Sequence, residues 1–301
     1  MKYLKWINKN VSDKSGKTAL ILGATGSFGA FISKALAYKG CNIIIAARSI
    51  DRLNLLKKEI MAINDKISID ILVVDLFSIK SVDSLIEDIS NITIDYFIST
   101  AGVYQLPSSK TLDNLEVHFE TNYFSQAYIL EYFVSNKKNT KLIFMSSISY
   151  RFNKIDYDNI ESIGIKNKTK IYARSKRLLL NHLCYYKKRG YNIEIPHPGI
   201  SPTNLFFGKN KGFKGIIKYI TFPLMKLIFQ NPSKCALGVL YSIDHNTKYM
   251  MQIGPRGLFK IWGYPHIYKL HKCVLNDKEH DKLLEKYNLI LDNVKNKEKI
   301  I

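Results

Sequence analysis

Short apolar runs alternate with longer amphipathic segments over the first two thirds of the chain. The short runs predict buried strands, and the segments with an apolar residue every three or four positions predict helices. The predicted strands span 17–22, 42–47, 69–74, 94–100, 141–145 and 191–195, with a last strand at 249–253. Because strands and helices alternate, we expect an α/β fold, a doubly wound parallel sheet with helices on both faces.

The helices between these strands are expected at 31–36, 49–63, 78–89 and 111–135, with Ser78 as a capping residue. Another helix should span 235–242. Within the 111–135 helix, Asn122 lies among apolar residues. A polar side chain in such surroundings must find partners, so Asn122 is either a structural hydrogen-bonder or a site residue.

A glycine-rich turn follows the first predicted strand and precedes a helix. It reads Gly23-Ala24-Thr25-Gly26-Ser27-Phe28-Gly29. Glycines at such a turn let a pyrophosphate approach the backbone, where the amino terminus of the helix offers free N–H groups. The order of strand, turn and helix therefore favours dinucleotide binding over a tight turn without a ligand.

Polar residues also follow the second and third strands. Arg48 and Ser49 stand where an acidic residue would hold the ribose 2′-hydroxyl of NAD, and an arginine suits a 2′-phosphate instead. This position favours NADP, although Arg48 could also just begin the next helix. Asp75 and Leu76 end the third strand and are placed to meet the adenine.

Candidate catalytic residues lie beyond the fourth and fifth strands. The fifth strand runs into Ser146 and Ser147 at its carboxyl end, where ligands bind in such sheets. Tyr172 and Lys176 are four residues apart, which places both side chains on one face of a helix. A fixed ammonium should lower the pKa of a neighbouring phenol and bring Tyr172 into range as a general acid or base. The alternative is an exposed pair without a catalytic role.

Together these motifs resemble the short-chain dehydrogenase/reductase superfamily over about residues 14–205. The pattern comprises the 23–29 turn, Ala101-Gly102, Asn122, Ser147, Tyr172 with Lys176, and Pro198-Gly199-x-x-x-Thr203. The interval from Ser147 to Tyr172 is similar to the retinol dehydrogenase and protochlorophyllide reductase-like branch. The resemblance implies a Rossmann-type sheet with a carboxyl-terminal substrate lid.

The resemblance also implies a role for each motif residue. Ser147 would polarise the substrate oxygen, Tyr172 would exchange the proton, and Lys176 would bind the nicotinamide ribose and lower the pKa of Tyr172. Asn122 would hold a water that links Lys176 to solvent. The implied cofactor contacts are Gly23, Thr25, Gly26, Ser27, Phe28, Gly29, Arg48, Ser49, Asp75, Leu76, Thr100, Ala101, Gly102, Tyr172, Lys176, Pro198, Gly199, Ile200 and Thr203.

Two positions depart from the family pattern. Ser27 stands where the commonest turn has its middle glycine, so the phosphate contacts of this turn could differ. Ser99-Thr100 replaces the usual Asn-Asn before Ala101-Gly102, so the support that an asparagine gives is absent or comes from Thr100. Neither change touches the proton-transfer residues.

The carboxyl-terminal third suggests how substrate is enclosed. Residues 206–230 combine an apolar face with interspersed lysines, which fits a lid over an apolar pocket, a packing helix or a contact with an anionic membrane. The lid is expected at about 205–230. The tail from 276 to 301 is expected to be a charged helix, packed on the body or on another subunit, with Leu283, Leu284, Tyr287 and Leu291 on one stripe.

Composition limits the remaining function classes. The 301 residues are 46% hydrophobic and carry a formal charge of +20, but the lysines are spread along the chain without a nucleic-acid-binding module. The four cysteines are far apart, which indicates neither a zinc site nor a disulfide framework. Without a signal-peptide core or an apolar run of about 18 residues, we expect a single domain over 1–301 in the cytoplasm.

The resulting prediction is an oxidoreductase that uses NADP(H) in preference to NAD(H) and acts on a small, apolar carbonyl or alcohol. Its rival is a catalytically silent NADP(H)-binding sensor or scaffold of the same fold. A further rival is a nucleic-acid or membrane-surface binder that uses the net charge. No metal and no specific nucleic acid are expected, and peripheral membrane contact stays open. The oligomeric state stays open, with a homo-oligomer as one alternative, since relatives are often dimers or tetramers.

Overall fold

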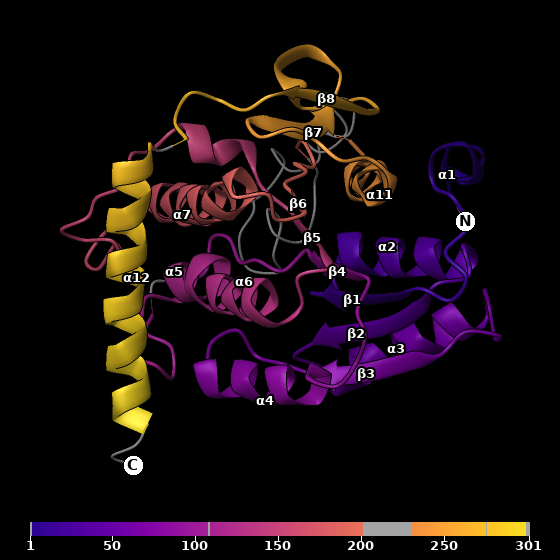
Figure 1. The fold of residues 1–301 in the computed structure, drawn as a ribbon, viewed down its shortest axis with the longest axis horizontal. Helices are drawn as coiled ribbons and strands as arrows, with labels where there is room; N and C mark the ends of the chain where they lie inside the picture. The colour runs from indigo at the N-terminus through magenta and orange to yellow at the C-terminus, as the bar shows by residue number, and fades with distance from the viewer. Residues whose placement is uncertain (1, 108, 201–229, 275, 299–301) are drawn as a thin grey trace, which may run out of the picture.

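A six-stranded parallel sheet forms the centre of the computed structural model, which describes residues 2–107, 109–200, 230–274 and 276–298 (Figure 1). Its strand order is β3-β2-β1-β4-β5-β6. The strands are β1 (Thr18–Leu22), β2 (Asn42–Ala47), β3 (Ile69–Val73), β4 (Tyr96–Ser99), β5 (Lys141–Phe144) and β6 (Ile193–Glu194). The order reverses direction between β1 and β4, which is where such sheets bind ligands. The predicted Rossmann-type fold is confirmed.

Helices cover both faces of this sheet. Alternate side chains of β1 separate the two layers, since Ala19 and Ile21 face one hydrophobic core while Leu20 and Leu22 face the other. The first layer contains α1 (Leu4–Asn10), α2 (Ser27–Tyr38), α3 (Ile50–Met61), α10 (Pro232–Cys235) and α11 (Leu237–Asp244). The second contains α4 (Ile79–Ile89), α6 (Ser125–Asn136) and α7 (Lys168–Lys188). The helix α1 is not among those predicted from the sequence.

The long helix expected at 111–135 is wrong in its first part. The helix begins at α5 (Val117–Phe119), continues as the π-helix η1 (Glu120–Phe124) and then becomes α6. Glu116 caps it by accepting hydrogen bonds from the N–H groups of His118 and Phe119. Asn114 before it has a left-handed φ of 65°, which marks a turn. Ser78 does precede α4, but its side chain makes no capping bond, and Asp113 accepts from Ile79 N instead.

The carboxyl-terminal part adds a hairpin and a long helix. The strand expected at 249–253 is β7 (Met251–Pro255), and it pairs in antiparallel fashion with β8 (Pro265–Lys269), which was not predicted. The helix α12 (Asp277–Glu298) packs across the second layer with Leu283 and Tyr287 buried, which confirms the expected helical tail on the body (Figure 1).

Two expectations concern residues that the structure does not describe. Residues 201–229 lie outside the described residues, so the proposed lid at about 205–230 and the cofactor contact from Thr203 stay predictions. Within the described ranges, no helix combines the length and the apolar character needed to cross a bilayer.

Candidate active site

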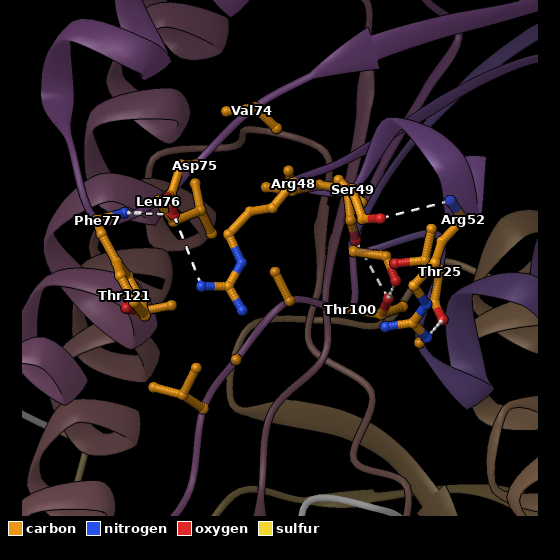
Figure 2. A pocket seen from close by; sticks show the side chains of 17 residues that line it. Thr25, Arg48, Ser49, Arg52, Val74, Asp75, Leu76, Phe77, Thr100 and Thr121 are labelled. Carbon is orange, nitrogen blue, oxygen red and sulfur yellow. Dashed lines mark hydrogen bonds and ion pairs between the residues drawn. The ribbon is translucent and has the colours of Figure 1, made fainter. Parts of the chain in front are cut away.

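A cavity of about 300 Å³ opens at the carboxyl ends of β1, β2, β3 and β4 (Figure 2). Many of the residues that line it were selected as cofactor contacts in the sequence analysis. They lie together because the carboxyl ends of adjacent parallel strands meet at one edge of the sheet. These residues are Gly23, Thr25, Gly26, Arg48, Ser49, Asp75, Leu76, Thr100, Ala101 and Gly102.

The glycine turn is shaped by close backbone contacts. Gly23 has a φ of +78°, and a Cβ on it would lie 2.8 Å from the backbone nitrogen of Ala101. A Cβ on Gly29 would lie 2.5 Å from the carbonyl oxygen of Gly23. Only glycine fits these positions, and Gly26 caps α2 with its N-terminal N–H groups beside the cavity. The turn therefore has the shape and the donors that a pyrophosphate needs.

Two arginines provide positive charge at the mouth of this cavity. The Arg48 side chain reaches toward Asp75, with Nη1 and Oδ1 4.0 Å apart, and its guanidinium lies 4.7 Å from the centre of the Phe77 ring (Figure 2). Arg52 Nη2 donates to the carbonyl oxygen of Thr25 at 2.6 Å. The helix α3 begins at Ile50, so Arg48 does not simply start it. Arg48 and Arg52 thus flank the turn that would hold a phosphate.

Thr100, which stands where the family pattern has asparagine, makes hydrogen bonds between two strand ends. The Thr100 hydroxyl donates to the carbonyl oxygens of Leu22 and Gly23 at 3.1 and 3.3 Å. It joins the end of β4 to the end of β1, directly under the glycine turn. Thr100 therefore makes a structural bond of its own at this position.

Asn122 connects the loop after β4 to the second helical layer. Its Oδ1 accepts from Val103 N at 2.7 Å and its Nδ2 donates to Val103 O at 2.9 Å, so the amide holds the loop after β4. The Nδ2 atom also donates to the hydroxyl of Ser175 on α7 at 3.2 Å. Asn122 lies on the π-helix η1, and such wide turns recur at functional sites. It is a structural hydrogen-bonder that also borders the site.

The candidate catalytic residues come from two elements. Ser147 follows β5 and caps the short helix η2 (Ile148–Arg151), and its hydroxyl lies beside the phenol of Tyr172 on α7, where a bond from it lowers the pKa of that phenol. Lys176 lies one turn further along α7, and its Nζ is near Gly102 of the cavity wall. The ring of Tyr104 meets that of Tyr172 edge to face, with centroids 4.8 Å apart. The structure thus brings Ser147, Tyr172 and Lys176 to the same edge of the sheet as the cavity.

Burial sets the protonation of the pair. It raises the pKa of Tyr172 to about 12, because the phenolate loses its water, although the bond from Ser147 acts in the opposite direction. Burial also lowers the pKa of Lys176 to about 8, because the ammonium is the charged form there. The expected lowering of the Tyr172 pKa by Lys176 is therefore wrong for this structure: desolvation dominates both groups.

Several other predicted contacts are not among the residues that line the cavity. Ser27, Phe28 and Gly29 begin α2 and are not among the cavity walls. The Pro198–Ile200 segment is also separate from the walls, with the N–H of Gly199 donating to His197 Nδ1 and that of Ile200 to Ile261 O. Ser27, Phe28 and Gly29 stay candidate contacts of the pyrophosphate, and Pro198–Ile200 stays a candidate contact on the nicotinamide side.

The sequence analysis missed several residues of the site. Arg52 could have been found, since a basic residue one helical turn after Arg48 points to the same region. Phe77 and Thr121 line the cavity, and Tyr104 touches Tyr172. Phe77 and Tyr104 lie in loops that carry no periodic pattern, and Thr121 lies in the π-helix η1, which the sequence did not indicate. Among the described residues, no group of His, Cys, Asp or Glu could hold a metal ion.

Comparison with known sequences gives a consistent result. Residues 17–155 match the family model for short chain dehydrogenase. The chain is 30% identical over 237 residues to short-chain dehydrogenase TIC 32 B, chloroplastic, of Brassica napus, a match that covers 72% of this chain and 74% of the relative. It is 26% identical over 233 residues to human retinol dehydrogenase 13, with 73% and 70% covered.

Solved structures share the fold. An uncharacterized protein of Mycobacterium paratuberculosis superposes with a TM-score of 0.75 at 18% identity and covers 94% of this chain and 96% of its own. A short-chain dehydrogenase of Sphingobium yanoikuyae in complex with NADPH gives a TM-score of 0.57 at 16% identity, covering 76% and 84%. At these identities the likeness concerns the architecture of the sheet and its helices.

Proposed function

Because the chain belongs to the short-chain dehydrogenase family, a family of oxidoreductases, we propose that it reduces an apolar carbonyl compound with NADPH and catalyses the reverse oxidation with NADP. The cofactor supplies the hydride, and the protein supplies orientation, a proton and a hydrogen bond to the reacting oxygen. The preference for NADP(H), the catalytic residues and the substrate class are the parts that go beyond family membership.

The cavity supports a nicotinamide dinucleotide with a 2′-phosphate. The turn at Gly23 and Gly26 would hold the pyrophosphate, since Cβ atoms are excluded from its backbone cradle. Arg48 and Arg52 would bind the 2′-phosphate, which a guanidinium can contact with two donors. Asp75 lies on the same wall and would meet the adenine rather than a ribose hydroxyl.

The proton would come from Tyr172. A phenol whose pKa is raised to about 12 stays protonated at neutral pH, so it can donate to a carbonyl oxygen during reduction. Ser147, whose hydroxyl lies beside that phenol, would donate a hydrogen bond to the same oxygen. Lys176 has a pKa near 8, which allows it to release a proton near neutral pH and so to restore the phenol after each turnover. Asn122 would keep the water path to Lys176 in place.

One observation carries this proposal. Gly102 is a wall of the nucleotide cavity, and the point where its Cβ would stand lies 3.4 Å from Lys176 Nζ and 3.1 Å from Asn122 Oδ1. The proposed cofactor site and the proposed proton-transfer residues therefore adjoin at one residue. An apolar substrate is proposed because a relative is named a retinol dehydrogenase.

The test is an NADPH oxidation assay across apolar aldehydes and ketones, with Ser147→Ala and its neighbour Ser146→Ala as matched variants. The hydroxyl of Ser146 is buried and has no hydrogen-bond partner among the described residues, whereas Ser147 contacts Tyr172. We expect Ser147→Ala to lower turnover by about a hundredfold or more and Ser146→Ala to change it little. NADPH binding without turnover on any compound would favour the sensor or scaffold instead.

A further inference from the structure

A loop rich in aromatic and basic residues joins β7 to β8. It reads Arg-Gly-Leu-Phe-Lys-Ile-Trp-Gly-Tyr over residues 256–264. Phe259 is 74% exposed, Trp262 51% and Tyr264 48%. Figure 1 shows this hairpin at one end of the molecule, beyond the edge of the parallel sheet. Large aromatic side chains that gather on a surface in this way mark an interaction site.

The loop holds these side chains outward by fixed backbone contacts. Its stem is closed by bonds from Arg256 N to Tyr264 O at 2.9 Å and from Gly257 N to Trp262 O at 2.8 Å. At the tip, Phe259 has a left-handed φ of 52°, which a bulky residue rarely adopts. The loop is held from below by bonds from Ile200 N to Ile261 O and from Gly263 N to Gln230 Oε1, while the Phe259 ring faces solvent. Strain of this kind persists mainly where it serves a function.

The part of the chain around the loop is almost free of acidic residues. Residues 231–274 contain six basic residues and one acidic residue, Asp244, whereas residues 51–95 contain five basic and nine acidic ones. Asp244 already pairs with Lys14 at 2.5 Å. The six basic residues are Lys234, Lys248, Arg256, Lys260, Lys269 and Lys272. The positive charge is therefore unevenly distributed along the chain, and the basic stretch includes the aromatic loop.

The amino-terminal helix extends the same surface. Trp6 of α1 stacks on Tyr264 with ring centroids 6.4 Å apart, and the ammonium of Lys234 lies 4.8 Å from the centre of the Tyr264 ring. The exposed residues Lys2, Lys5 and Lys9 belong to this amino-terminal segment, which contains no acidic residue before Asp13. Two segments that are far apart in the sequence, both rich in basic residues, thus meet at Trp6 and Tyr264.

We propose that this surface, the 256–264 loop with α1 beside it, binds the face of an anionic lipid bilayer. Aromatic rings of Phe, Trp and Tyr partition into the headgroup region, and lysines and arginines around them are attracted to anionic lipids. The apolar Phe259 at the tip fits insertion between lipids. A nucleic acid would instead bind to the charged side chains alone or stack on the aromatic rings. The experiment distinguishes binding to vesicles from binding to a nucleic acid.

The test uses the two tryptophans of the chain, Trp6 and Trp262. Trp6→Phe keeps the ring that packs on Tyr264 and leaves Trp262 as the fluorescent reporter. We expect its emission to shift to the blue on vesicles that contain phosphatidylserine, with a much smaller shift on pure phosphatidylcholine. Brominated lipids should quench it, because the indole would lie at the depth of the headgroups.

Matched variants identify the residues that bind. Phe259→Ser should lower the vesicle partition coefficient about tenfold, since it removes an exposed aromatic ring from the proposed interface. Arg256→Gln should lower it about fivefold on anionic vesicles. Leu55→Ser removes a 61% exposed apolar residue on α3, remote from this surface, and should leave partitioning unchanged.

The proposal fails if phosphatidylserine vesicles do not bind the protein or if Phe259→Ser and Leu55→Ser partition alike. It also fails if Trp262 keeps its emission, or if the protein binds duplex DNA or RNA but not vesicles. Circular dichroism and NADPH titration of each variant show that the fold is kept, and vesicle binding does not depend on any catalytic role for Tyr172.

Discussion

The Nζ atom of Lys176 lies 3.4 Å from the point where a Cβ on Gly102 would stand. Gly102 follows β4 and lines the nucleotide cavity, while Lys176 belongs to α7, which packs on the other side of the loop. The absent side chain at position 102 therefore leaves room for a lysine and for the amide of Asn122. This contact joins the cavity proposed for the cofactor to the residues proposed for proton transfer.

Gly102→Ala should damage catalysis more than stability. The added methyl would meet Asn122 Oδ1 at 3.1 Å and Lys176 Nζ at 3.4 Å, so one of them must move. We expect turnover to fall about ten- to a hundredfold, because small displacements of catalytic groups have effects of that size. Gly238→Ala is the control, since its nearest neighbours would be 3.8 Å away. Steady-state kinetics that show equal losses in both variants would contradict this assignment.

Arg48→Gln and Arg52→Gln should each weaken NADPH binding about five- to tenfold, because a charged hydrogen bond to the 2′-phosphate would be lost. Binding of NADH, which has no such phosphate, should change less than about twofold. Lys58→Gln, in the last turn of α3, removes the same charge and serves as the control. Fluorescence titration measures all four proteins, and a parallel loss for both nucleotides would exclude the proposed 2′-phosphate contact.

The fold could be read from the sequence wherever the apolar period was unambiguous. The six parallel strands are all predicted, because runs such as 42–47 are buried on both faces of the sheet. The error at 111–116 arose because Leu115 and Phe119 have helical spacing, yet the helix begins only at Val117, and Leu112 is 83% exposed in a turn before it. The strand β8 escaped notice because it begins with Pro265 and pairs only with β7, in a two-stranded ribbon.

The site was predictable where sequence motifs lie at strand ends. Parallel strands bring their carboxyl ends to one edge, so Gly23, Arg48, Asp75 and Thr100 meet without further information. The contact between Tyr104 and Tyr172 depends on a loop in which Gln105 has a φ of +60°, and no pattern indicates that. The direction of the pKa shift was missed because it depends on how deeply α7 buries its side chains.

The buried Glu120 should make stability depend on pH. Burial, helped by nearby Asp113, raises its pKa from the ordinary 4.5 to about 9. Between these values the folded protein binds a proton that the unfolded chain has lost, so the free energy of unfolding should fall as pH rises. Since each pKa unit corresponds to about 1.4 kcal/mol, the free energy of unfolding should fall by several kcal/mol in total between these two pKa values.

Glu120→Gln removes the titrating group without changing the shape of the side chain. In urea unfolding, the variant should be more stable than the native protein at about pH 8, and the gap should narrow toward about pH 5. Glu87→Gln makes the same chemical change at an exposed position of α4 and should follow the native curve. Parallel pH curves for the native protein and Glu120→Gln would show that Glu120 is ionised in the folded state.

The central claim is that Tyr172 transfers the proton that accompanies hydride transfer. Its most direct test is the single-turnover rate of carbonyl reduction by NADPH in Tyr172→Phe, measured beside the dissociation constant of NADPH. We predict a rate at least about a hundredfold lower and a dissociation constant within about threefold of the native value, because the phenol acts on the substrate and not on nucleotide affinity. An undiminished rate in Tyr172→Phe would contradict the account.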